Sequence, residues 1–314
     1  QNIHLRTRED PMLAEFLAEL EVEEMGVAVP TEIRDLAEPF RIWQEGIVDR
    51  ERRSGRYVMP GGINQAGLTN AMDRAQAAIQ RGDPSGYRSS SQIATAMRLH
   101  HLINHLLCQG IAASRYFLSR MEAEDSKSKS AKDFLRDPRV RSLSDRLLEM
   151  DEIHSKVGAV RRMVRERVKR DAESRIIVFA NYRDTVEALE KALDGLEGIK
   201  AIQFIGQSSR SGSGGLTPKQ QISRLEEFRS GGANVLVATS VGEEGLDIPS
   251  ADLVVFYEPV SSEIRTIQRR GRTGRRRGGE VVVLIAEGTR DEGAKDSARR
   301  KEEFMHKAAR RVSR

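Results

Sequence analysis

The chain has 314 residues, enough for two domains of ordinary size that each bury a core. Charged residues make up 32% of it and hydrophobic residues 38%, which excludes a disordered chain and predicts a globular protein. The formal net charge of +5 favours an anionic partner such as nucleic acid.

The single cysteine, Cys108, excludes an intrachain disulfide and fits a reducing compartment, so a cytoplasmic location is expected. The longest apolar runs, such as residues 281–286, have about six residues, far fewer than the roughly 20 that span a bilayer. The first residues lack the apolar core of a signal peptide. We therefore expect no membrane partner. The chain begins without Met, and we expect it to be part of a longer protein.

Residues 1–30 differ in pattern from the residues that follow. The segment LEVEEMGVAVP alternates apolar and polar residues and ends at Pro30, which is typical of an edge strand. Since helical patterns follow directly, we expect this strand to belong with another part of the protein.

Residues 31–137 predict an all-helical domain. Apolar side chains recur every three or four positions near its start, and Trp43 among them is expected in the core. Two further helices are expected to end at Gly82 and Gly110, because glycine commonly ends a helix. The polar stretch 124–133 predicts a linker or mobile loop.

A long amphipathic helix or helix pair is expected from Pro138 to about residue 170, and strand and helix patterns alternate from residue 174 onward. The predicted strands are 174–181, 199–206, 234–240, 251–259 and 279–288. The helices between them include one that begins at Thr217 and Pro218, suited to the cap and the first helical position. Continuous Val/Ile runs that alternate with amphipathic helices indicate an α/β fold with a parallel sheet covered on both faces.

The motif ATSVGEEGLDIP follows one of these strands, where α/β sheets bind ligands. Thr239 and Ser240 offer hydroxyl groups, and Gly242 and Gly245 allow a backbone to approach a ligand closely. Asp247 is placed to accept hydrogen bonds from a ribose. The alternative is a capped turn with solvated acids.

The segment QRRGRTGR places Gln268, Arg272 and Arg275 at offsets of four and three, so on a helix they share one face. Two guanidinium groups aimed at one point can stabilise the charge on a transferring γ-phosphoryl group. The alternative is a nonspecific basic patch.

Together, IIVFANYRD, VLVATSVGEEGLDIP, VVFYEPV and IRTIQRRGRTGR resemble motifs IV, V and VI of the second RecA-like domain of superfamily 2 helicases. The amino-acid sequences of these segments are similar to those of archaeal Hef and its relatives, the Fanconi anaemia group M translocases. The resemblance is strong over about 140–305 and weaker over 31–135, where Hef-like proteins have a thumb-like helical insertion. It implies a RecA-like parallel sheet flanked by helices and preceded by an all-α thumb-like domain.

The resemblance also implies boundaries. Residues 1–30 would be the exit from a first RecA-like domain, 31–137 the thumb-like insertion, 138–290 the second RecA-like domain and 291–314 a C-terminal helix. It implies an ATP-dependent DNA helicase that acts on forked or branched DNA with ATP and Mg²⁺. Its partner would be the first RecA-like domain of the same polypeptide.

Residue roles follow from the same resemblance. Arg272 and Arg275 would reach the γ-phosphate, Gln268 would help to place the attacking water, and Gly245 and Asp247 would lie near the ribose. The expected nucleic-acid contacts are Asn181, Arg183, Gln207, Thr239, Ser240 and Gly242.

No G-x-x-x-x-G-K-[ST] cradle for phosphates occurs in the chain. The sequence DEIH at 151–154 spells the box that binds Mg²⁺ in these helicases, but a helical pattern rather than a strand precedes it, which favours a structural role. We therefore expect the chain to bind DNA without hydrolysing ATP. An RNA helicase or duplex-RNA sensor of the same superfamily is the alternative.

His101, His105 and Cys108 fall on one predicted helix face. Three ligands on one helix would still need a fourth ligand and a closed geometry to bind zinc, so a core or groove face is the preferred interpretation and no metal site is predicted.

Overall fold

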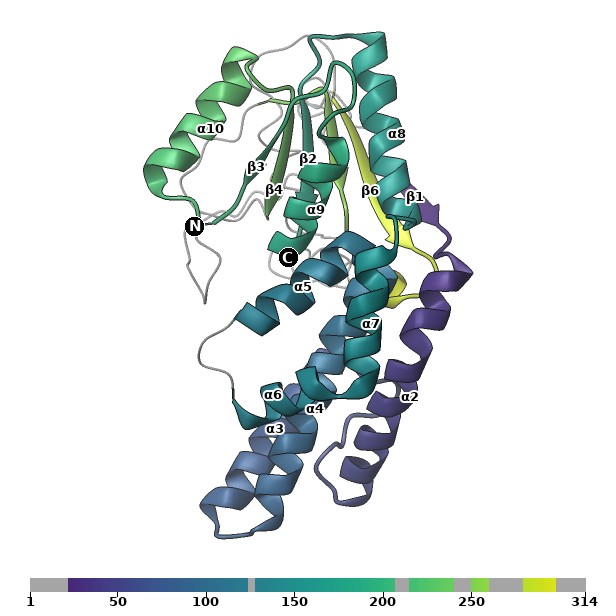
Figure 1. The fold of residues 1–314 in the computed structure, drawn as a ribbon, viewed down its shortest axis with the longest axis vertical. Coiled ribbons are helices and arrows are strands. Elements are labelled where there is room, and N and C mark those ends of the chain that lie inside the picture. The colour runs from purple at the N-terminus through teal and green to yellow at the C-terminus, as the bar shows by residue number, and fades with distance from the viewer. Residues whose placement is uncertain (1–21, 124–127, 207–214, 240–249, 260–278, 298–314) are drawn as a thin grey trace, which may run out of the picture. The chain divides into compact units, whose positions relative to one another are not determined.

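The computed structural model describes residues 22–123, 128–206, 215–239, 250–259 and 279–297 (Figure 1). The described chain divides into two compact units. The α/β unit contains residues 22–29 and the chain from Ser155 onward, and the helical unit spans Pro30–His154. None of the helices within the described ranges is long and apolar enough to cross a membrane.

The α/β unit is built on a six-stranded parallel sheet with the order β1-β6-β5-β2-β4-β3. Its strands are β1 (Val22–Val27), β2 (Ile176–Ala180), β3 (Ala201–Phe204), β4 (Val235–Thr239), β5 (Leu253–Phe256) and β6 (Glu280–Ala286). The five strands predicted between residues 174 and 288 are confirmed.

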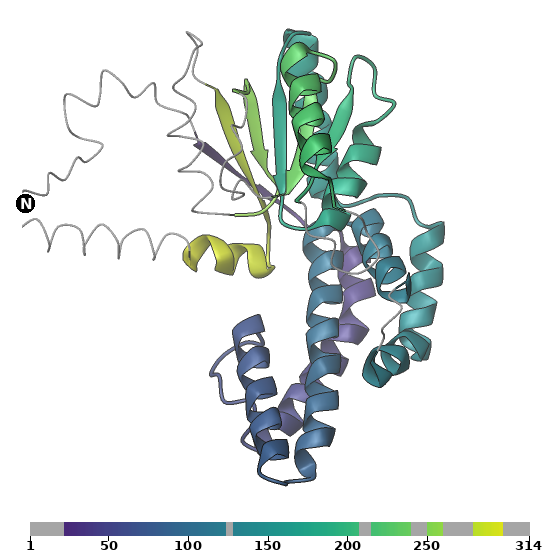
Figure 2. The ribbon, with the colours of Figure 1, turned by 90° about the vertical axis from the view of Figure 1, so that its left-hand side faces the viewer.

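Helices cover both faces of this sheet, which confirms the predicted fold class (Figures 1 and 2). Helices α8 (Ser155–Arg170) and α9 (Arg183–Leu193) pack on one face, and α10 (Pro218–Ser230) packs on the other. Thr217 caps α10 as predicted, and its side chain and that of Gln220 form a reciprocal capping box.

Strand β1 corrects one expectation about the N-terminal segment. It is an edge strand, as the alternating pattern predicts, but it pairs in parallel with β6, with Val22 opposite Val281 and Val27 opposite Ala286. The strand therefore belongs to the α/β unit of this chain. Met25 and Val27 pack against its core, which explains the alternation.

The helical unit contains seven helical segments among its described residues. They are α2 (Thr31–Arg53), α3 (Gln65–Gln80), α4 (Ser85–Asn104), η1 (His105–Gln109), α5 (Ile111–Ala123), α6 (Lys129–Arg136) and α7 (Pro138–Glu149). Helices α3 and α4 form an antiparallel hairpin, visible in both views (Figures 1 and 2). The buried apolar side chains of these two helices include Leu68, Leu99 and Leu102.

Two expectations about the second half of the helical unit are wrong. The stretch 124–133 is not a continuous linker, because α6 begins at Lys129 behind the Ser128 cap and buries Ala131 and Phe134. The helical unit also runs to His154 instead of ending at residue 137. Helix α7 belongs to it because Val140, Leu143 and Leu147 are buried there and α7 packs against α5 and α6.

The end of α4 departs from a regular helix. Residues His105–Gln109 form a π-helical segment, in which the N–H of Gly110 donates to the carbonyl of His105 at 2.9 Å. Gly110 then ends the segment with a φ of 123°, a backbone conformation that favours glycine. The predicted helix end at Gly110 is thus confirmed. The wider π-helical turn before it could not be predicted from the spacing of the apolar residues.

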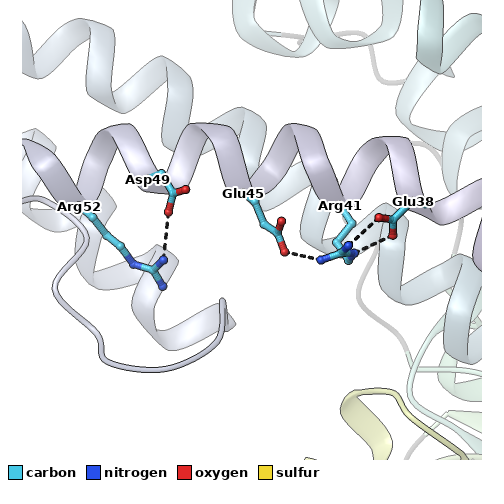
Figure 3. Close-up of polar contacts among 5 residues, drawn as sticks. All are labelled: Glu38, Arg41, Glu45, Asp49 and Arg52. Carbon is cyan, nitrogen blue, oxygen red and sulfur yellow. Dashed lines mark hydrogen bonds and ion pairs between the residues drawn. The ribbon is translucent and has the colours of Figure 1, made fainter.

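The outer surface of α2 is a ladder of intrahelical ion pairs (Figure 3). Arg41 contacts Glu38 at 2.6 Å and Glu45 at 2.5 Å, and Arg52 contacts Asp49 at 3.2 Å. Each arginine lies three or four positions from its carboxylate partner, so both charges meet on one helix face. The cationic side chains in this ladder are therefore largely neutralised.

Candidate nucleic-acid and nucleotide site

Two of the predicted contact residues lie at the same edge of the sheet. Ala180, the last residue of β2, pairs with Thr239, the last residue of β4. Asn181 follows Ala180 directly and is exposed. Parallel strands end at a common edge, where open α/β sheets bind their ligands. The structure therefore places Asn181 and Thr239 at one edge of the sheet, and their contact with nucleic acid stays a prediction.

Arg183 begins α9 close to this edge and is half-buried. Its Nη2 donates a hydrogen bond to the carbonyl oxygen of Gly206 at 2.9 Å. That bond ties the start of α9 to the segment that leaves β3.

Glu258 is a site residue that sequence reasoning misses. It follows β5 by two positions, is only 4% exposed, and its Oε2 accepts the backbone N–H of Asn181 at 3.1 Å. The carboxylate therefore fixes the turn that presents Asn181. The sequence does place this acid directly after the apolar run VVFY. That position could have indicated a buried carboxylate with a hydrogen-bonding partner, because burying a charge requires a compensating partner.

A buried ion pair lies at the same edge and was also missed. Lys156, the second residue of α8, is fully buried, and its Nζ lies 2.5 Å from Oδ2 of Asp291. The same ammonium group donates to the carbonyl oxygen of Tyr257 at 2.6 Å. Oδ2 of Asp291 also accepts the N–H of Ala286 at 3.0 Å. This node joins the start of α8 to the ends of β5 and β6.

The remaining predicted site residues lie outside the described part of the chain. They are Gln207, Ser240, Gly242, Gly245, Asp247, Gln268, Arg272 and Arg275. Their predicted roles stay predictions.

Residues 155–277 match the family described as helicase conserved C-terminal domain, and residues 62–154 match the family described as putative ATP-dependent RNA helicase, helical bundle. Both matches meet at the boundary between the two structural units. The crystal structure of the Pyrococcus furiosus Hef helicase domain is similar over 93% of this chain and 60% of that one, with a TM-score of 0.73 and 34% identity. The chain carries the C-terminal region of a Hef/Fanconi anaemia group M-like superfamily 2 helicase.

Two curated relatives show how much of a full-length protein this Hef-like helicase region represents. It is 35% identical over 305 residues to a putative ATP-dependent RNA helicase of Methanocaldococcus jannaschii, a match that covers 97% of this chain and 38% of the relative. It is 47% identical over 121 residues to the ATP-dependent DNA helicase mph1 of Neurospora crassa, which covers 38% of this chain and 10% of the relative. The chain thus spans well under half of either protein.

The DEIH sequence of this Hef-like region has a structural role. It lies in the turn between α7 and α8, so no strand precedes it. The Glu152 carboxylate accepts the backbone N–H groups of Ile111 and Ala112 at 3.1 and 2.9 Å, at the start of α5. His154 is buried, with its Nε2 at 2.9 Å from the carbonyl oxygen of Leu107. Glu152 therefore caps a helix, in agreement with the structural interpretation.

His105 and Cys108 are buried in the helical unit. The Nδ1 of His105 lies 2.8 Å from the carbonyl oxygen of His101, and its ring stacks on Phe117 with centroids 4.5 Å apart. These contacts fit the preferred core interpretation. No cluster of three or more potential metal ligands occurs among the residues that the structure describes.

Trp43 lies at the rim of the helical core and is half-buried. Its ring stacks on Phe134 with centroids 5.9 Å apart, and the guanidinium of Arg139 lies 3.7 Å from the ring centroid. The expected core position therefore holds only in part, because the half-buried ring also contacts a cation.

Proposed function

We propose that this chain supplies the second half of an ATP-dependent DNA translocase motor that acts on forked or branched DNA. The observation that carries the proposal is the meeting of Asn181 and Thr239 at the carboxyl edge of a parallel sheet within a helicase C-terminal domain. Polar side chains and backbone groups at this edge suit the phosphates of a nucleic-acid strand. ATP-driven closure against a first RecA-like domain would move these contacts along the strand.

Arg272 and Arg275 complete the nucleotide site in this proposal. They would stabilise the charge that develops on the γ-phosphoryl group, with Gln268 placing the water and Gly245 and Asp247 beside the ribose. ATP and Mg²⁺ would be held mainly by the first RecA-like domain, because the chain has no G-x-x-x-x-G-K-[ST] sequence. The chain alone would therefore bind nucleic acid without turnover.

An RNA substrate is the second candidate. The family matched by residues 62–154 and the M. jannaschii relative are both described as putative ATP-dependent RNA helicases, whereas the N. crassa relative is named as a DNA helicase. Contacts to the phosphate backbone do not by themselves separate DNA from RNA. Competition between a DNA fork and an RNA duplex for the chain decides between them, and preference for RNA would overturn the DNA proposal.

ATP hydrolysis stimulated by nucleic acid tests the motor proposal. We expect no turnover by the chain alone and measurable turnover after addition of a separately produced first RecA-like domain of a Hef-like helicase. In that mixture Arg275→Ala should lower the rate by about 10³-fold, the scale for removing an arginine from a phosphoryl-transfer site.

Arg277→Ala is the matched control, since Arg277 lies two positions beyond the motif and should leave the rate unchanged. Turnover by the chain alone, or equal loss from both substitutions, would contradict the proposed division of the site.

A further inference from the structure

The outer face of α8 carries a row of cationic side chains that the proposed motor does not use. We call these residues the α8 basic stripe: Arg161, Arg162, Arg165 and Lys169. All four are exposed. With 3.6 residues per turn, these positions gather on one exposed side of the helix, about a third of a turn from the buried Val157, Val160 and Val164. The stripe therefore faces away from the sheet that α8 covers.

The charge of this stripe is not paired with any acidic side chain that the structure describes. Glu166 is the single acidic residue on α8 and lies at the margin of the stripe. None of the four cationic side chains has a hydrogen bond or ion pair with any described residue. On α2, by contrast, Arg41 and Arg52 are paired with carboxylates three or four positions away (Figure 3). Within the described part of the chain, the positive charges of the α8 basic stripe are thus unpaired.

The stripe also has the length and space for an extended anion. A rise of 1.5 Å per residue puts Arg161 and Lys169 about 12 Å apart along the helix, which corresponds to about three phosphates of one strand of a duplex. A surface hollow of about 440 Å³ runs beside it and is lined by the stripe together with Gly158 and Glu166. A Cβ added at Gly158 would meet no atom within 4 Å, so this end of the hollow is open.

The composition of the stripe selects the kind of partner. Guanidinium groups bind phosphate oxygens in a bidentate manner. A protein partner usually needs an apolar anchor at the centre of its interface, and the residues lining this hollow include no apolar side chain. An acidic protein surface is therefore the weaker fit, and a phosphate backbone the better one.

We propose that the α8 basic stripe binds the phosphate backbone of a nucleic-acid duplex, as a second contact separate from the strand-end residues Asn181 and Thr239. This inference rests on the proposed action on nucleic acid. Helix α8 begins at the carboxyl edge of the sheet, where Lys156 meets the end of β5, and runs back toward the start of β2. A duplex bound to the stripe would therefore lie along the flank of the α/β unit, beside the sheet edge that is proposed to contact a nucleic-acid strand.

The salt dependence of duplex binding tests this proposal. The triple variant Arg161→Gln/Arg165→Gln/Lys169→Gln and the unmodified chain are titrated with a labelled linear DNA duplex at several salt concentrations, with fluorescence anisotropy as the readout. The slope of log K against log salt should become shallower by about 2 to 3, because each lost phosphate contact removes about 0.9 from it. The same titration with an RNA duplex shows which duplex the stripe binds.

The matched control removes three positive charges of the same unit that are already paired. Lys191, Lys200 and Lys295 form ion pairs with Glu187, Glu227 and Glu24. The variant Lys191→Gln/Lys200→Gln/Lys295→Gln should leave the slope close to that of the unmodified chain. An equal change in both triple variants would mean a general charge effect and would overturn the proposal.

Failure of this inference can be told apart from failure of the proposed function. If the stripe variant binds both duplexes as the unmodified chain does, while Arg183→Ala weakens binding, the stripe proposal alone is wrong. If the unmodified chain binds neither duplex nor fork, both proposals are wrong. Circular dichroism of each variant confirms that the fold is intact.

Discussion

Buried charges hold the carboxyl edge of the sheet together. Glu258 fixes the turn at Asn181, and Lys156 pairs with Asp291 while bonding to the carbonyl of Tyr257. Breaking one partner of such a pair leaves the other charge buried and uncompensated, which is far more destabilising than losing an exposed pair. These buried charges are therefore needed to keep in place the edge of the sheet that presents the proposed nucleic-acid contacts.

Lys156→Met should lower the free energy of unfolding by about 3–5 kcal/mol, because the Asp291 carboxylate remains buried without its ammonium partner. The double variant Lys156→Met/Asp291→Asn should recover part of that loss, since asparagine carries no charge. Urea unfolding followed by circular dichroism measures both. Lys191→Met, which removes an exposed pair with Glu187, is the control and should change stability by about 1 kcal/mol or less. A Lys156 variant as stable as this control would contradict the argument.

Helix ends in this protein are set by single polar side chains. Asp137 starts α7: its Oδ1 accepts the N–H of Arg139 at 3.0 Å, and its carboxylate also pairs with the Arg139 side chain at 2.8 Å. The side-chain hydrogen bond from Arg139 holds the pKa of the Asp137 carboxyl below its usual value. The same guanidinium lies over the Trp43 ring, so this cap joins α7 to α2.

The Asp137 cap should give a pH-dependent contribution to stability. Since its pKa in the folded chain is below the unfolded value of about 3.9, the contribution is complete at neutral pH and is lost as the pH falls through the folded pKa. Asp137→Ala should lower the free energy of unfolding at neutral pH by about 1 kcal/mol, and Asp137→Asn by less because the amide oxygen still caps the helix.

Urea titrations at neutral and acidic pH measure this effect. The difference between the unmodified chain and Asp137→Asn should disappear at a pH below the folded pKa. Asp145→Asn, an exposed change on the same helix, should have no effect at either pH. A difference between the unmodified chain and Asp137→Asn that stays constant with pH would refute the linkage.

Elements with local signals were predictable, and elements defined by distant partners were not. The Thr217–Pro218 start of α10 and the end at Gly110 follow from residues that act on their own backbone. Helix α6 was missed because its lysines and serines outweigh the two apolar residues that it buries, Ala131 and Phe134. The ends of β2 and β4 were predicted, whereas Lys156, Glu258 and Asp291 find their partners only in the folded sheet.

At the scale of the molecule, the helical unit is an uninterrupted stretch of chain with its own core. Its buried side chains contact one another within Pro30–His154, and its helix caps, such as Glu152 at the start of α5, come from the same stretch. A segment whose core and helix caps are both formed by its own residues meets the requirements of an independent folding unit.

The isolated segment Pro30–His154 should therefore fold. We expect a helical circular dichroism spectrum and one cooperative urea transition. Leu102→Ala in the isolated segment should lower its stability by about 2–5 kcal/mol, as expected for truncating a fully buried leucine. A broad transition without cooperativity, or no response to Leu102→Ala, would show that the segment depends on the rest of the chain.

Strand β1 has a consequence for how the chain is made. It leaves the ribosome before the helical unit, yet its partner β6 is the last strand of the sheet to be synthesised, with Val22 opposite Val281. Until β6 has been synthesised, β1 is thus a strand without this neighbour, the state in which strands pair with the wrong chain. Glu23 and Glu24 lie in this strand and are exposed in the folded protein. Their like charges discourage pairing between nascent copies until β6 arrives.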